Sequence, residues 1–240
     1  MLPGLTPHTR PTGWNFAASL LFIPTFDQVG SIRPVLPVGW TLNFEMLFYT
    51  LFACSLALRI NPLWTTPVLA GLAAAGFWQN AAWPAPFSLA NGMVLEFAAG
   101  MVIGATRWTV PTRVAPWILT AAVILLLALP PAGHWRFLEW GIPAAAILAA
   151  ALALESNIGP RLPVSVRAVG DASYAIYLAH PFVVPSLACH GAVVAAASIP
   201  VSVAAGLVLH WLIDTPLQRR LSEKGRVAPV YGAEGEIVLS

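Results

Sequence analysis

The feature that most constrains the fold of this chain is a succession of long apolar stretches separated by short clusters of arginine, proline and glycine. Several of them approach the ~20 residues with which a helix crosses roughly 30 Å of bilayer hydrocarbon. Of the 240 residues, 58% are hydrophobic and 9% are charged, whereas an ordinary soluble domain is about 25% charged. The sequence therefore predicts an all-α fold, a polytopic bundle of transmembrane helices.

Hydropathy divides the chain into a transmembrane domain with a segment on each side. Residues 1–38 are predicted to form an N-terminal periplasmic or interfacial segment, because the apolar piece 14–26 is too short to span a bilayer. Residues 39–220 are predicted to form the transmembrane domain. Residues 221–240 lack apolar periodicity and are predicted to form a disordered cytoplasmic tail. Seven spans are predicted in the domain, at about 39–59, 63–79, 87–106, 115–131, 137–154, 172–191 and 198–215.

The positions of the basic residues predict the orientation in the membrane, because cytoplasmic loops carry the excess of Lys and Arg. A cytoplasmic C-terminus places nine of the twelve Lys and Arg residues inside and three outside. Seven spans then leave the N-terminus outside, without a signal peptide, which predicts that upstream spans are absent from this chain. The net charge of +2 is small and scattered, so no nucleic-acid partner is expected.

Glu45 stands out in the first predicted span, because an ionisable side chain inside a membrane costs several kcal/mol unless it has a partner or faces water. Helical spacing puts Thr41, Glu45 and Tyr49 on one face, four residues apart. The face combines a hydroxyl, a carboxylate and a phenol, which suits orientation of a substrate hydroxyl or support of a catalytic base. The alternative is structural: Glu45 binds a neighbouring helix or pairs with an arginine such as Arg33.

The sixth predicted span opens with a second polar face. Ser173, Tyr177 and His180 are spaced four and three residues apart, and Tyr174 is beside the same stripe. Asp171 precedes them at a position that suits a helix N-cap. The face is a candidate site with an imidazole at its centre. The alternative is that His180 only forms hydrogen bonds between helices.

Glu96 is predicted to lie in the middle of the third span, on a stripe with Gly100 and Gly104. Small residues at this spacing let another helix approach closely. Glu96 is therefore either a buried hydrogen-bonding partner at a tight helix crossing or a functional group.

The remaining polar residues of the spans are interpreted as structural. Asp214 is expected to end the last span before the arginine pair at 219 and 220, and His190 and His210 are interpreted as packing or interface residues. No metal site is predicted.

Four strings, in order from Pro34 to Arg220, resemble segments of the acyltransferase family 3 membrane proteins. PVLPVGWTLNFEMLFYTLFA resembles the family's Trp-Thr/Ser-Leu-x-x-Glu segment, and LEFAAGMVIG its Glu-Phe-x-x-Gly segment. VGDASYAIYLAHPFV is similar to Gly-Asp-x-Ser-Tyr-x-x-Tyr-Leu-x-His. HWLIDTPLQRR resembles the closing segment, where the family usually has Glu at the position of Asp214.

The resemblance implies an enzyme of the bacterial inner membrane that moves an acyl group, often acetyl, from acyl-CoA to a sugar hydroxyl. Acyl-CoA would be a donor substrate, and no bound cofactor is implied; the other partners are a carbohydrate acceptor and membrane lipid. Family members have about ten spans, of which the first carries an Arg and a His that acts as general base. Nothing near Met1 matches that segment, so truncation with loss of activity is one expectation.

The site implied by the resemblance has Glu45 and His180 as its catalytic residues, with His180 as the intramembrane candidate for a substitute base. Substrate-binding positions are Trp40, Thr41, Asn43, Tyr49, Ser173, Tyr174 and Tyr177, and the structural polar positions are Glu96, Asp171 and Asp214. Two other functions remain open: a non-catalytic membrane subunit that binds a glycan or lipid, and a small-molecule transporter.

Overall fold

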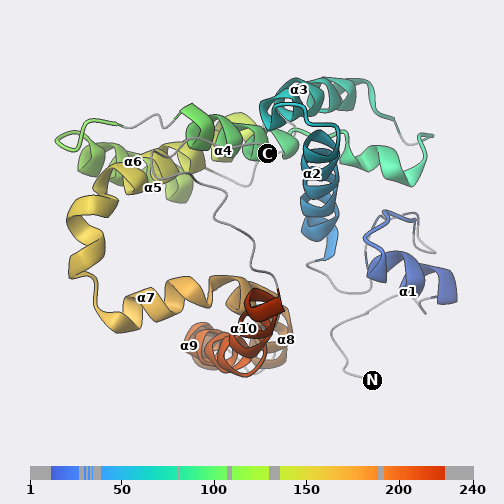
Figure 1. Cartoon of the computed structure of the whole chain (residues 1–240). Helices are drawn as coiled ribbons and strands as arrows, with labels where there is room; N and C mark the ends of the chain where they lie inside the picture. Colours follow the sequence, from blue (N-terminus) through green and yellow to red (C-terminus); the bar gives the residue numbers. More distant parts are fainter. Residues whose placement is uncertain are drawn as a thin grey trace. The chain divides into compact units, whose positions relative to one another are not determined.

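Helices build the protein in the computed structural model shown in Figure 1. The structure describes residues 12–26, 30, 32, 34, 39–80, 82–106, 110–129, 136–188 and 192–224. These residues contain no β-strand, only an isolated antiparallel bridge between Phe26 and Ile32. The predicted all-α class is therefore confirmed. The chain divides into two compact units, whose described parts are 12–161 and 162–224.

The unit 12–161 alternates longer helices with short 3-10 and π turns. Thr12 caps the first helix, because its hydroxyl oxygen accepts a hydrogen bond from the Asn15 amide at 3.2 Å. The elements are α1 (Gly13–Leu20), α2 (Gly39–Ala57), η1 (Pro62–Trp64), α3 (Thr65–Ala75), η2 (Gly76–Trp78), η3 (Ala85–Leu89), α4 (Val94–Thr106), α5 (Ala115–Ala128), η4 (Phe137–Gly141), α6 (Ile142–Ile158) and η5 (Gly159–Arg161).

Two apolar cores hold this unit together. The first joins α2, α3 and α4 around fully buried Leu69 and Val94, and the aromatic rings of Phe48 and Phe97 pack against it. The second joins α5 and α6 through small side chains, since Ala115, Ala149, Ala150 and Ala153 are buried there. The small side chains let the two helices approach closely.

The turn before α4 packs tightly against the end of α3. A Cβ on Gly76 would lie 2.9 Å from the carbonyl carbon of Ala90 and closer still to its oxygen, so a side chain fits there only if the backbone moves. Residues 85–89 form the 3-10 turn η3, and α4 begins only at Val94. The predicted start of this span, at residue 87, was wrong, because turn backbone occupies the first part of the segment.

The unit 162–224 consists of α7 (Val164–Asp171), α8 (Ser173–Ala188), α9 (Ala192–Leu209), η6 (His210–Asp214) and α10 (Thr215–Lys224). Helices α8 and α9 lie side by side (Figure 1). Their contact uses small residues: Ala172, Ala175 and Ala179 are buried, as are Ser198 and Ser202. A Cβ on Gly206 would lie 2.7 Å from the amide nitrogen of Ile176 and closer to its Cα, so the backbones nearly touch.

Both π turns lie just before a proline. The turn η4 ends two residues before Pro143, and η6 ends two residues before Pro216. Proline removes an amide donor and clashes with the preceding turn, and local widening of the helix relieves this conflict. The Thr215 amide and hydroxyl both donate to the His210 carbonyl, the hydroxyl at 3.1 Å. The helix therefore continues past Asp214, and the predicted end at that residue was wrong.

Two helices among the described residues have the length and apolar composition needed to cross a bilayer, Phe137–Arg161 with 25 residues and Ala196–Leu221 with 26. Only 28% and 17% of their apolar windows are buried, whereas a core helix of a water-soluble protein is mostly buried. Helices also occupy the other five predicted spans, but α4 and α5 have only 13 and 14 residues. The count of seven spans stays a prediction.

The ends of the chain match the predicted segments only in part. The first segment, 1–38, contains the short helix α1, and residues 1–11 and most of 27–38 lie outside the described residues. The predicted disordered tail, 221–240, is wrong at its start, because α10 continues to Lys224. Residues 225–240 lie outside the described residues.

Candidate functional site

The predicted polar face of α2 contains a direct contact between its two ionisable side chains. The hydroxyl of Tyr49 donates a hydrogen bond to Oε1 of Glu45 at 2.6 Å. The predicted i to i+4 placement of these two residues is thus confirmed. Glu45 is half-buried and Tyr49 is 50% exposed. The phenol uses one of the several acceptor positions of the carboxylate, so Glu45 can still accept a further hydrogen bond.

The other residues predicted on α2 do not all share this face. Asn43 is buried at 5% exposure, beside Phe44 of the first core, while Trp40 is 41% exposed and packs edge-on against Phe44 with ring centroids 6.3 Å apart. Residues two apart on a helix point to opposite sides. Asn43 is therefore directed away from Glu45, and Thr41 is the half-buried residue one turn before Glu45.

Glu96 lies in the first turn of α4, not in the middle of a helix as predicted, because α4 begins late. Its carboxylate oxygen Oε1 is 3.6 Å from Nε of Arg136, and the Arg136 guanidinium lies 5.0 Å from the ring centroid of Trp140. Both side chains of the ion pair are about one-third exposed, at 34% for Glu96 and 32% for Arg136. The pair links α4 to the π turn before α6.

Glu96 also lines an open pocket of about 500 Å³ with Phe48, Phe97, Gly100 and Met101. The rings of Phe48 and Phe97 stack with centroids 5.1 Å apart. Among the described residues, nothing lies within 4 Å of a Cβ placed on Gly100 or Gly104. The part of the chain that the structure describes thus places no close helix crossing at these glycines, and Gly100 borders the pocket.

The polar face of α8 brings two predicted residues together. Nδ1 of His180 lies 2.6 Å from the backbone oxygen of Tyr177, and the two rings are 5.5 Å apart. A carbonyl only accepts, so Nδ1 carries the proton and the lone pair is on Nε2. Ser173 and Tyr174, at the start of α8, are exposed. Asp171 is the last residue of α7, so the predicted N-cap of α8 was wrong.

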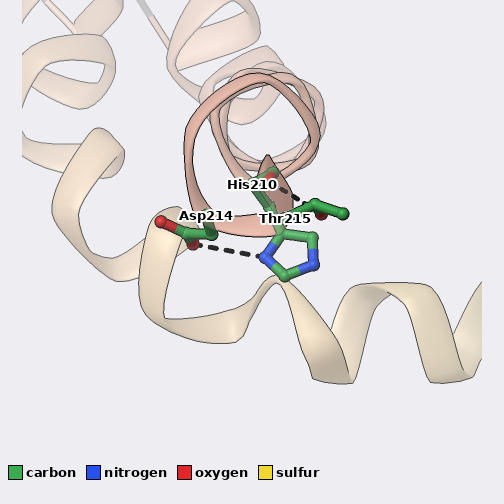
Figure 2. Close-up of polar contacts among 3 residues, drawn as sticks. All are labelled: His210, Asp214 and Thr215. Carbon is green, nitrogen blue, oxygen red and sulfur yellow. Dashed lines mark hydrogen bonds and ion pairs between the residues drawn. The ribbon is translucent and has the colours of Figure 1, made fainter. Parts of the chain in front are cut away.

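A fourth polar group was not predicted from the sequence. Figure 2 shows His210, Asp214 and Thr215 at the π turn, where Nδ1 of His210 lies 3.2 Å from Oδ2 of Asp214. The signal was available, because the two residues are four apart on a helix. The contact gives His210 a polar partner that was not predicted.

The four polar groups are divided between the two units: Glu45 and Glu96 belong to 12–161, and His180 and His210 to 162–224. Within the described residues, no cluster of three or more His, Cys, Asp or Glu side chains has the arrangement of a metal site. The side chains of the four groups are carboxylates, a phenol, imidazoles and a guanidinium, of which the first three can bind hydroxyl groups and move protons.

The comparison with curated proteins assigns the chain to a family. It is 33% identical to the exopolysaccharide production protein ExoZ of Rhizobium meliloti (strain 1021) over an alignment of 257 positions, which covers 98% of this chain and 78% of ExoZ. No protein-family model matches the chain. No solved structure matches it either. The identity and coverage show that this chain belongs to the family of the exopolysaccharide production protein ExoZ.

Proposed function

We propose that this protein is a membrane acyltransferase that moves an acyl group, in particular acetyl, from acyl-CoA to a hydroxyl group of an envelope or exported carbohydrate. The observation that carries this proposal is the 33% identity with ExoZ, which covers 98% of the chain. The relative's name refers to exopolysaccharide production. The ordered resemblance of four segments to acyltransferase family 3 supports acyl transfer as the reaction.

The proposed location is the bacterial inner membrane, with several spans and the C-terminus in the cytoplasm. The mostly exposed apolar helices Phe137–Arg161 and Ala196–Leu221 support it. On the second helix, Trp211, Leu212 and Ile213 are 74%, 58% and 55% exposed. Large apolar side chains in such numbers fit contact with lipid better than contact with water.

In this proposal, Glu45 and Tyr49 bind the acceptor. The Tyr49 hydroxyl fixes one oxygen of Glu45 at 2.6 Å, and the other carboxylate oxygen accepts the hydrogen bond of a sugar hydroxyl. The lone pair on Nε2 of His180 supplies a base for a hydroxyl proton, and Ser173, Tyr174 and Tyr177 contribute hydroxyl groups to substrate binding. Acyl-CoA is a substrate, and the reaction needs no bound cofactor.

A non-catalytic role in glycan binding is the second candidate, and the open pocket beside Glu96 favours it. The stacked rings of Phe48 and Phe97 offer flat apolar surface, and Glu96 offers a carboxylate, in a pocket of about 500 Å³. Apolar walls with a few polar groups are typical of binding sites for small ligands. Such a pocket would bind a sugar whether or not the protein transfers an acyl group.

Acyl content of the exported polysaccharide tests the proposal. Bacteria that lack their own transferase would express the unaltered chain, Glu45→Gln, or the control Glu155→Gln, which changes an exposed glutamate of α6. We expect ester-linked acetyl groups, measured by NMR, with the unaltered chain and the control, and at least a ~10-fold loss with Glu45→Gln. Equal acetylation with Glu45→Gln would remove Glu45 from the reaction. Polysaccharide bound to the chain without any acetylation would favour the binding role.

A further inference from the structure

The last long helix has a polar stripe on one side. Ser202 and Gly206 are buried, and His210 and Asp214 are half-buried at 21% and 32% side-chain exposure, whereas the neighbouring apolar side chains are exposed. These four residues are spaced by four, so they follow one face of the helix. At Gly206 this face meets the backbone of Ile176 in α8. The imidazole and carboxylate therefore continue the packed face of the helix.

The geometry points to His210 as a further general base, held in place by Asp214. An ionised carboxylate only accepts hydrogen bonds, so the 3.2 Å contact puts the proton on Nδ1 and the lone pair on Nε2. In Figure 2 the other ring nitrogen of His210, Nε2, points away from Asp214. A base oriented at one nitrogen by a carboxylate and reactive at the other is the arrangement used in nucleophile-activating triads.

The π turn supports this assignment. His210 and Asp214 are the first and last residues of this turn. The Thr215 hydroxyl donates a hydrogen bond to the His210 carbonyl at 3.1 Å, which restrains the backbone at His210. Single π turns within α-helices occur frequently at functional sites. Ser202, on the same stripe, has a buried hydroxyl oxygen without a hydrogen-bond partner among the described residues. The stripe thus presents a hydroxyl, an imidazole and a carboxylate on one side of an otherwise apolar helix.

The groups that face Nδ1 differ between His210 and His180. When Nε2 takes a proton, the imidazolium at His210 faces the negative charge of Asp214, whereas His180 faces only the carbonyl of Tyr177. Hydrogen bonds to an ionised partner are roughly twice as strong as those between neutral groups.

The assignment of His210 rests on the proposed acyl transfer. A sugar hydroxyl gives its proton to Nε2 of His210 while its oxygen bonds to the thioester carbonyl carbon. The carbon–sulfur bond then breaks, and the imidazolium returns the proton to the departing CoA thiolate. In the predicted topology this end of the helix faces the cytoplasm, where acyl-CoA is found. The exposed Arg219 and Arg220 on α10 would favour its phosphates.

Kinetics of acetyl transfer in membrane vesicles, with acetyl-CoA as donor and isolated polysaccharide as acceptor, test the role of His210. We expect His210→Ala to lower kcat by about 100-fold or more with little change in KM. His210→Gln, which can keep a hydrogen bond to Asp214, should show the same loss. The control Leu212→Ala changes an exposed side chain of the same turn and should leave kcat unchanged. Near-normal kcat in either His210 variant would overturn the inference.

Asp214 is a positioning residue, and a conservative replacement separates this role from simple helix stabilisation. Asp214→Asn should lower kcat at least ~10-fold, and Asp214→Glu should restore most of it, because a carboxylate and not an amide supports the imidazolium. A purely structural pair of this spacing contributes little to helix stability, so its loss would not produce that split in kcat. Equal activity of Asn and Glu variants would overturn the role of Asp214. No transfer by the unaltered chain would instead overturn the proposed function, and with it the assignment of His210.

Discussion

Glu96 and Arg136 join two helices that are far apart in the sequence. The carboxylate Oε1 of Glu96, in the first turn of α4, lies 3.6 Å from Nε of Arg136, which directly precedes the π turn before α6. The same arginine nitrogen is buried and makes no hydrogen bond within the part of the chain that the structure describes. Glu96 is therefore the charge that offsets a partly buried cation.

Removing this charge should destabilise the unit 12–161. We expect Glu96→Gln to lower the free energy of unfolding by about 1–2 kcal/mol, less than for a fully buried pair because both side chains are about one-third exposed. Denaturant unfolding of the protein in detergent micelles measures the change. In a double-mutant cycle with Arg136→Gln, the double variant should lose less stability than the sum of the two single losses. Glu155→Gln, which removes an exposed glutamate, is the control for a change of charge alone. Additive losses would show that the pair does not interact.

The contact between Gly206 and Ile176 predicts a large effect of a single methyl group. Gly206→Ala would place a Cβ 2.7 Å from the Ile176 amide nitrogen, so α8 and α9 must separate. Overpacking of this kind costs about 1–3 kcal/mol, and we expect a lower thermal unfolding temperature. Gly170→Ala is the matched control in the same unit, because nothing within the described residues lies near its Cβ. Equal stability of the two variants would contradict the close contact.

Two glycines near the end of α3 should respond to alanine with opposite signs. Gly76→Ala should destabilise, because its Cβ would collide with the Ala90 backbone. Gly71 lies within α3, and a Cβ there would meet open space. Gly71→Ala should therefore raise the free energy of unfolding by about 0.5–1 kcal/mol, the usual gain in helix propensity. Thermal unfolding of both variants under the same conditions tests the pair. Stabilisation by Gly76→Ala would show that the turn before α4 lies elsewhere.

Labelling from the two sides of the membrane tests the span Phe137–Arg161. Its 25 residues extend about 37 Å as a helix, enough to cross the hydrocarbon. In a chain with Cys54→Ala and Cys189→Ala, we introduce Leu138→Cys or Ser156→Cys. An impermeant thiol reagent should label position 138 from the periplasm and position 156 only from the cytoplasm. Labelling of both positions from one side would contradict a crossing.

Local patterns predicted much of this structure. Helices occupy all seven apolar segments, because the period of a helix and the length of an apolar run are properties of adjacent residues. The bond between Tyr49 and Glu45 follows from the same local spacing. The contact between His210 and Asp214 has this spacing too, although the spacing alone does not say which of several polar pairs form a contact.

The missed features depend on contacts between distant segments. The late start of α4 accompanies the close approach of Ala90 to Gly76, which no pattern within either segment indicates. The partner of Glu96 is forty residues away at Arg136, so helical spacing could not find it. The π turn at His210 has a local cause, Pro216, but a proline in this position predicts the end of a helix, whereas here the helix widens and continues.

The central claim is acyl transfer by this chain, and transfer of labelled acetyl from acetyl-CoA to polysaccharide by the purified protein in lipid vesicles tests it most directly. The account predicts ester-linked label on the polysaccharide, released by mild base, that requires both the chain and the acceptor. Loss of the label with Glu45→Gln, at unchanged insertion and unfolding temperature, would link it to the site on α2. A folded, inserted chain that binds polysaccharide and transfers no label would contradict the account.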